Sequence, residues 1–95
     1  MKSVFKALGD PTRRQILELL KADDLTAGAI AEHFTMSKPS VSYHLDILQQ
    51  ADMVLRQRKG QYIVYSLNTS VLDELVAWLI ALQENENDDN DDNDT

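Results

Sequence analysis

Residues 37–48 read Ser37-Lys38-Pro39-Ser40-Val41-Ser42-Tyr43-His44-Leu45-Asp46-Ile47-Leu48, and this stretch predicts a helix with two unlike faces. Val41, Leu45 and Leu48 recur at i, i+4 and i+7, which is the spacing of a buried stripe. Ser37 can cap the first free amides of the helix, and Pro39 costs little in the first turn because the amide there has no intrahelical acceptor. We therefore predict a helix over about 38–51.

The faces away from the buried stripe carry short hydrogen-bonding groups, one cation and one aromatic ring. They belong to Lys38, Pro39, Ser40, Ser42 and Tyr43. Hydroxyl groups and an aromatic ring near the start of a helix can meet base edges or thymine methyl groups in the major groove of DNA. Alone, the same residues would equally fit a solvated helix face, but a basic segment further along the chain favours the DNA interpretation.

Three shorter helices are expected before this one. The apolar residues of a brief opening helix are Val4, Phe5 and Leu8. This helix ends at Gly9, and Asp10-Pro11 then supplies an N-cap and a first-turn proline for a second helix over about 11–21. A third helix is predicted over about 26–34, and Thr35-Met36 is the turn that leads into the helix at 38.

After Ala51 the sequence changes from a helical to a strand pattern. β-Branched and aromatic residues form two runs separated by Lys59-Gly60, which predicts a β-hairpin over about 54–67. Its cations are Arg56, Arg58 and Lys59. They suit contacts with DNA phosphates, although such charges also guard exposed β-edges. Helices followed by a basic hairpin predict a winged helix-turn-helix fold, mainly α-helical with a small β wing.

A last helix is predicted over about 70–83, and it is apolar over an arc too wide for one small core to cover. Trp78 lies on this arc, and the opening helix is apolar as well. Exposed apolar surfaces of this kind are typical of association sites. We therefore predict a homodimer through the first and last helices, with an interface of Val4, Phe5, Leu8, Leu72, Leu75, Trp78, Leu79 and Leu82.

Length and composition set the broad class. A chain of 95 residues forms one small domain, and without cysteine it has neither disulfides nor thiolate metal sites. The opening Met1-Lys2-Ser3-Val4-Phe5-Lys6 does not resemble a signal peptide, and no stretch approaches the roughly 18 apolar residues of a membrane span. We expect a cytoplasmic protein without membrane insertion.

The net charge of −7 is concentrated at the C-terminal end. Seven of the sixteen acidic residues lie in 84–95, which leaves nine in 1–83 against all nine Lys and Arg. We therefore divide the chain into a folded domain, 1–83, and an acidic tail, 84–95, which is expected to be disordered because it has no apolar residue to bury. Such a tail either aids solubility or mimics phosphate and speeds release from non-specific DNA.

Four motifs, in order over residues 3–82, resemble the ArsR family of bacterial transcription factors. They are Phe5-Lys6-Ala7-Leu8-Gly9-Asp10-Pro11-Thr12-Arg13-Arg14-Gln15-Ile16-Leu17, Leu25-Thr26-Ala27-Gly28-Ala29-Ile30-Ala31, the run from Ser37 to Leu45, and Gly60-Gln61-Tyr62-Ile63-Val64-Tyr65-Ser66-Leu67. The resemblance implies a dimeric winged helix that represses transcription by occupying an operator. Its two-fold symmetry predicts an inverted repeat.

The same resemblance implies how the DNA is held. The helix at about 38–51 would lie in the major groove, and the hairpin at about 54–67 would lie on the backbone or in the minor groove. The contacts would be made by Lys38, Pro39, Ser40, Ser42, Tyr43 and His44, and by the wing tip at Arg56, Arg58, Lys59 and Gly60.

The metal sites known from the family have no counterpart in this sequence, because 27–34 lacks cysteine and 71–83 lacks histidine. The chain thus resembles the metal-free autorepressor branch of the family, which uses no cofactor. His33 and His44 have no clear third metal ligand. Ser42, His44 and Asp46 diverge on a helix and cannot form a catalytic triad, so no enzyme activity is expected.

Some alternatives remain open from the sequence. Arg13 and Arg14 are expected on the surface of the second helix or paired with acids, rather than on DNA. The alternative function is a protein-interaction module that has kept the winged helix and lost DNA binding. Release from DNA could come from a small molecule at the dimer interface, a partner protein that sequesters the dimer, or concentration-dependent autoregulation.

Overall fold

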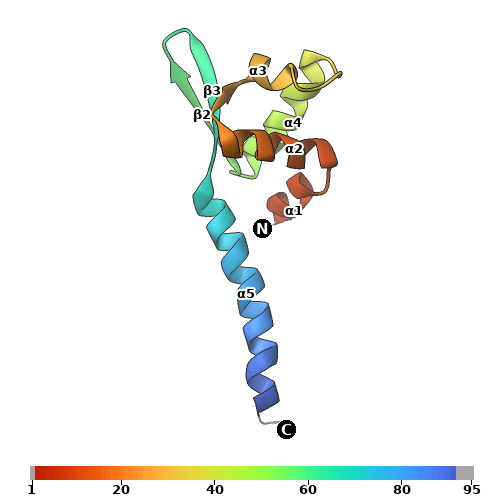
Figure 1. Cartoon of the computed structure of the whole chain (residues 1–95), viewed down its shortest axis with the longest axis vertical. Coiled ribbons are helices and arrows are strands. Elements are labelled where there is room, and N and C mark those ends of the chain that lie inside the picture. Colours follow the sequence, from red (N-terminus) through yellow and green to blue (C-terminus); the bar gives the residue numbers. More distant parts are fainter. Residues whose placement is uncertain (1, 92–95) are drawn as a thin grey trace.

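Five helices and three strands make up the computed structural model, which describes the backbone of residues 2–91 and the side chains of 2–84 (Figure 1). Their bounds are α1 Lys2–Leu8, α2 Pro11–Ala22, β1 Leu25–Thr26, α3 Ala27–Ala31, α4 Lys38–Gln50, β2 Val54–Lys59, β3 Tyr62–Leu67 and α5 Thr69–Asp91. The predicted architecture is confirmed: the chain is a winged helix-turn-helix, mainly α-helical, with a small antiparallel wing.

Side-chain caps begin α2, α3 and α4. The Asp10 carboxylate accepts hydrogen bonds from the backbone N–H groups of Thr12 at 2.9 Å and Arg13 at 3.2 Å. The Ser37 hydroxyl accepts from the N–H of Ser40 at 3.3 Å. Both caps were predicted, and both satisfy amides that the first turn of a helix leaves without an intrahelical acceptor. A third cap, at α3, is formed by the hydroxyl of Thr26.

The sheet has one strand more than the sequence predicts. Its order is β1-β3-β2, with antiparallel pairs throughout, so the predicted hairpin is confirmed but β3 lies between two partners. The extra strand pairs Leu25 with Tyr65 and Thr26 with Val64. The third helix is correspondingly shorter than predicted, because Thr26 belongs to β1 and α3 ends at Ala31. A two-residue strand has no alternating pattern, so only its distant partner reveals it.

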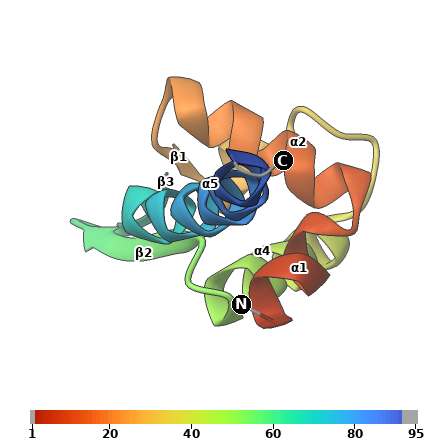
Figure 2. The same cartoon turned by 90° about the horizontal axis from the view of Figure 1, so that it is seen from below.

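The core lies between the helices and the inner face of the sheet. The predicted stripe of α4 is buried, with Val41, Leu45 and Leu48 each no more than 1% exposed. Ile16 of α2 and Ile30 of α3 are fully buried in the same cluster. Viewed along the long helix, α1 lies against α2 and α4 on one side of this core (Figure 2). These contacts hold α4 in place and leave its other face outward.

The last helix, α5, packs against the core only through its first turns. Val71, Leu72 and Leu75 touch the core cluster and Trp78 contacts Phe5 of α1, after which the helix leads away from the rest of the described chain (Figure 1). It continues to Asp91, beyond the predicted end at about 83. Residues 92–95 lie outside the described residues, and the division into a domain, 1–83, and a disordered acidic tail, 84–95, stays a prediction. None of the described helices has both the length and the apolar composition that a membrane span requires.

Candidate nucleic-acid interface

The outward face of α4 presents the polar residues that the sequence singled out. Lys38, Pro39, Ser40, Ser42 and Tyr43 are all exposed, and Tyr43 keeps 60% of its surface accessible. The hydroxyl of Ser40 accepts a hydrogen bond from the Ser37 hydroxyl at 3.1 Å, so its own O–H can donate outward. The face thus offers a cation, two hydroxyl groups and an aromatic ring on one rigid helix.

The wing carries its cations on exposed strand positions. Arg56, Arg58 and Lys59 are exposed and lie on β2, opposite Tyr65, Ile63 and Tyr62 of β3, respectively. Because side chains alternate along a strand, Arg56 and Arg58 share one face of the wing and Lys59 lies on the other. Among the described side chains, none of these cations has an acidic partner within 4.0 Å. They are therefore available to an anionic partner.

Gly60 forms the tip of the wing between β2 and β3. Its φ of 62° lies in the left-handed region, which a residue without a side chain adopts without strain. The two strands can therefore reverse tightly at the tip. This turn keeps Lys59 at the end of the wing, next to its paired residue Tyr62.

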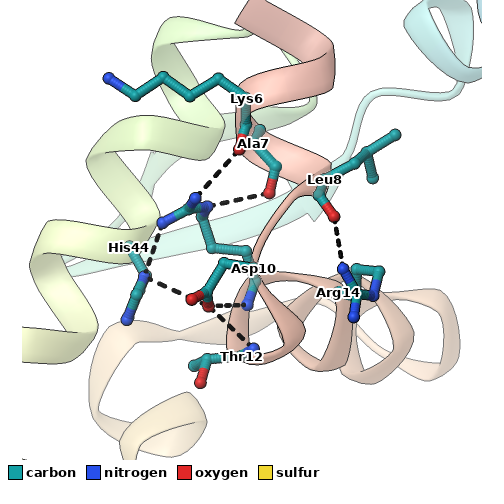
Figure 3. Close-up of polar contacts among 8 residues, drawn as sticks. Lys6, Ala7, Leu8, Asp10, Thr12, Arg14 and His44 are labelled. Atoms are coloured by element: carbon teal, nitrogen blue, oxygen red, sulfur yellow. Dashed lines mark hydrogen bonds and ion pairs between the residues drawn. The ribbon is translucent and has the colours of Figure 1, made fainter.

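Arg13 lies in the interior, whereas the sequence predicts it on the surface of α2 or paired with an acid. Only 8% of it is exposed, and its guanidinium binds three acceptors, on the labelled residues Lys6, Ala7 and His44 of Figure 3. Nε donates to the Ala7 carbonyl at 2.9 Å, and Nη2 donates to the Lys6 carbonyl at 3.0 Å. Nη1 lies 3.1 Å from Nδ1 of His44. Arg14 is exposed, as predicted, and donates to the Leu8 carbonyl at 2.6 Å.

The spacing of Arg13 in the sequence indicates burial, although its charge predicts a surface position. Positions 13, 16 and 20 follow helical spacing, and Ile16 and Leu20 form the buried stripe of α2. The last carbonyl groups of α1 need donors, because a helix leaves its final carbonyls without intrahelical partners. Arg13 supplies these donors, which compensates for the burial of its charge.

His44 is turned away from the exposed residues of its own helix. Its side chain is 15% exposed, and Nδ1 lies 3.9 Å from the Asp10 carboxylate as well as beside Arg13 (Figure 3). The ring of Tyr43 meets the His44 ring edge-on, with the centroids 5.5 Å apart. His44 therefore lies at the border between the interior and the face of α4 that carries Ser42 and Tyr43.

The Asp10 carboxylate makes the stability of the fold depend on pH in the acid range. Partial burial raises its pKa, but hydrogen bonds from the backbone N–H groups of Arg13 and Thr12, together with the nearby imidazole of His44 and guanidinium of Arg13, outweigh that effect. The pKa of Asp10 consequently lies below its ordinary value. A carboxylate with a lowered folded-state pKa stabilises the protein at neutral pH, and this contribution is lost as the pH falls through the acid range.

Exchanging Asp10 for alanine should therefore lower the free energy of unfolding at neutral pH by about 1 kcal/mol, the usual cost of losing an N-cap. Asp10→Asn is the matched control, because asparagine caps a helix nearly as well but carries no charge. Urea unfolding from neutral pH to about pH 3 should show that Asp10→Asn loses less stability on acidification than the wild type. Equal acid dependence in the two proteins would contradict the role of the charge.

The predicted dimer residues lie on α1 and α5, but they differ in exposure. Trp78 and Phe5 are 43% and 46% exposed, and their rings are in contact with centroids 5.6 Å apart. Leu79 and Leu82 are exposed too, whereas Leu8, Leu72 and Leu75 are half-buried. Val4 is buried in the core of its own chain. The exposed members form an apolar surface, which we call the α1/α5 face; it consists of Phe5, Trp78, Leu79 and Leu82.

The side chains of 2–84 do not bring metal-ligating residues together. No group of three or more histidine, aspartate or glutamate residues in this part of the chain could hold an ion. Of the two histidines, His33 is exposed and His44 is engaged by Arg13.

Comparison with known proteins agrees with this geometry. The family model for bacterial regulatory proteins of the arsR family matches residues 10–55, which run from the Asp10 cap through α4 into the wing. The transcriptional repressor SdpR of Bacillus subtilis is 56% identical over 89 residues, which cover 93% of this chain and 99% of that protein.

Two solved structures are similar over most of their length. An ArsR-like transcriptional regulator from Rhodococcus sp. RHA1 superposes with a TM-score of 0.83 at 29% identity, covering 90% of this chain and 81% of the other. The homodimeric winged helix-turn-helix DNA-binding domain of Mb0332 from Mycobacterium bovis has a TM-score of 0.69 at 30% identity, covering 93% and 78%. Sequence motifs, fold and relatives agree, and this chain belongs to the ArsR family of bacterial regulatory proteins.

Proposed function

We propose that this protein is a transcriptional repressor that binds an inverted-repeat operator as a homodimer. The observation that carries the proposal is the outward polar face of α4 followed by a wing of exposed cations. Its similarity to a named repressor over nearly the whole of both chains supports the same function. We expect α4 to read the major groove and the wing at 54–67 to hold the backbone or the minor groove.

In this proposal α4 makes the base contacts, and the wing together with Lys38 of α4 makes the phosphate contacts. Ser40, Ser42 and Tyr43 are suited to base edges, since hydroxyl groups donate and accept, and an aromatic ring can contact a thymine methyl group. Lys38, Arg56, Arg58 and Lys59 are suited to phosphates, and Pro39, His44 and Gly60 complete the contact surface of the proposal. Phosphate contacts set the register of the protein on the duplex, whereas base contacts select the sequence.

The α1/α5 face is proposed as the dimer interface. Half-exposed Trp78 and Phe5 are large aromatic side chains of the kind that anchor interfaces. Two-fold symmetry would bring the two α4 helices into successive major grooves, about 34 Å apart. A dimer seated on a promoter then represses by steric exclusion, and binding to its own upstream DNA would make it an autorepressor. Such a regulator would act in the cytoplasm, without enzyme activity.

The proposal is tested by fluorescence anisotropy with DNA from upstream of the gene and with a scrambled duplex, across a salt series. We expect specific binding in the range of about 10⁻⁸–10⁻¹¹ M, with an affinity that falls steeply as salt rises. Equal, weak binding to both duplexes, together with no enriched sequence in a selection from genomic fragments, would instead favour a protein-interaction module.

Replacing Ser40, Ser42 and Tyr43 together by alanine should remove discrimination between operator and scrambled DNA. Each mismatched base contact costs about 1–3 kcal/mol, so the operator affinity should fall at least a hundredfold while non-specific binding changes little. Asp46→Ala is a control on an exposed position of the same helix. Unchanged discrimination in the triple variant would refute the assignment of these three residues.

Besides a small molecule at the dimer interface, release from DNA has two candidate routes that need no inducer, and we favour these. A partner protein could sequester the dimer, or repression could follow the concentration of the protein alone. Adding a dialysed extract of derepressed cells, from which small molecules have been removed, to the preformed complex separates these two routes, because sequestration by a protein still releases the DNA at constant repressor concentration.

A further inference from the structure

The Arg13–His44 contact determines which nitrogen of His44 carries a proton. An arginine guanidinium has five N–H donors and no acceptor. Nη1 of Arg13 lies 3.1 Å from Nδ1 of His44, so Nδ1 must accept and cannot carry the hydrogen. A neutral imidazole has one N–H group, which therefore lies on Nε2. His44 is thereby held as a single tautomer rather than as the mixture found for a solvated histidine.

The same contact determines where the remaining N–H group points. Nδ1 faces Arg13 and Asp10, and Nε2 lies on the side of the ring away from that cluster (Figure 3). The adjacent Tyr43 packs against the ring from the exposed face of α4. Nε2–H is thus a hydrogen-bond donor at the border of the surface proposed to face DNA.

We propose that Arg13 is a positioning residue for DNA binding, which fixes the tautomer and ring orientation of His44 so that Nε2–H donates to a phosphate oxygen. The inference rests on the proposed function. Arg13 is buried in α2 and does not itself face the DNA, but in this way it determines how His44 of α4 is presented to the DNA.

The Arg13 guanidinium also links His44 to α1, the helix that contributes Phe5 to the α1/α5 face. Its other two bonds go to the carbonyl groups of Lys6 and Ala7, in the last turn of α1. Phe5, the residue before Lys6 in this helix, touches Trp78. One rigid, planar group therefore joins the helix of the proposed dimer interface to the DNA-reading helix. Lysine could not replace it, since an ammonium group lacks the fixed fork that reaches three acceptors.

Two substitutions of His44 separate its two nitrogens. His44→Asn keeps an acceptor near the position of Nδ1 and removes the donor at Nε2, whereas His44→Gln can place an amide donor near the position of Nε2. We expect His44→Asn to weaken operator binding by roughly 10- to 100-fold, the scale of a hydrogen bond to a charged acceptor, and His44→Gln to bind more tightly than His44→Asn. The salt dependence should be unchanged, because a neutral donor releases no counterion.

Nitrogen NMR of the full chain, at a pH where histidine is neutral, reads the tautomer directly. His44 should have a bare Nδ1 and a protonated Nε2, while exposed His33 should show averaged signals. In Arg13→Lys the His44 signals should move toward the average, and operator affinity should fall. The loss in Arg13→Lys combined with His44→Asn should be less than the sum of the two single losses, because both changes remove the same interaction.

The inference fails if Nδ1 of His44 carries the proton, or if His44→Asn binds the operator as tightly as the wild type and the control His33→Asn do. These results differ from failure of the proposed function, in which the wild type itself does not distinguish operator from scrambled DNA. If Arg13→Lys does not fold, the His44 substitutions and the wild-type spectrum still decide the question.

Discussion

Exchanging Trp78 for glutamate is expected to turn a dimer into a monomer and to reduce operator affinity about a thousandfold or more, to the level of non-specific binding. The Trp78 ring contacts Phe5 at 5.6 Å and still has 43% of its surface exposed in the single chain. A carboxylate at the centre of an apolar interface would be buried without a partner, at a cost of several kcal/mol. A monomer would bind only one half-site, which accounts for the loss of affinity.

Sedimentation equilibrium and anisotropy on the same samples test this prediction. Ile80→Glu is the matched control, because Ile80 is equally exposed on α5 but lies about 200° around the helix from Trp78 at 100° per residue. We expect Ile80→Glu to remain dimeric and to bind the operator. A dimeric Trp78→Glu protein with normal operator affinity would refute the α1/α5 face as the interface. Thermal unfolding of both variants checks that the fold is retained.

Removing the three wing cations together, Arg56→Ala, Arg58→Ala and Lys59→Ala, should weaken binding to operator and random DNA alike. Each phosphate contact contributes about 0.9 to the slope of log affinity against log salt, so three contacts per subunit correspond to a change of about 5 in the dimer. At physiological salt we expect at least a hundredfold loss of affinity on both duplexes. Discrimination between them should remain, because base recognition by α4 is untouched.

Comparing two single lysine substitutions controls for the change in net charge. Lys59→Ala and Lys21→Ala each remove one exposed cation, but Lys21 lies in the last turn of α2 and outside the wing. Only Lys59→Ala should reduce the salt slope, by about 1 for each phosphate that the variant no longer binds. Equal slopes for these two variants and the wild type would mean that the wing cations serve only to guard a β-edge.

The two surfaces differ in what each should control. Variants at the α1/α5 face should alter association and, through it, affinity for the paired half-sites. Wing variants should alter salt dependence in a protein that remains dimeric, and substitutions in the outward face of α4 should alter discrimination. Measuring association state, salt slope and specificity on one set of proteins therefore assigns each surface independently.

Local sequence patterns were enough to predict most of the fold and the outward residues of the candidate site. The buried stripe of α4, the caps at Asp10 and Ser37 and the β-hairpin depend on residues within a few positions of one another. Helical period, capping and turn chemistry act over that range, so they can be read without knowing the rest of the fold. The exposed face of α4 follows directly, because it is the complement of the buried stripe.

Long-range contacts decided the remaining features. β1 exists because Leu25 and Thr26 pair with a strand far along the chain, and Arg13 is buried because α1 and His44 supply its acceptors. The helical spacing of Arg13 with Ile16 and Leu20 indicates burial, whereas its charge predicts a surface position. Only the positions of its hydrogen-bond partners in the fold decide between the two. A buried charge such as that of Arg13 is stable only when residues elsewhere in the chain complete its hydrogen bonds. A strand as short as β1 likewise forms only where a distant strand pairs with it.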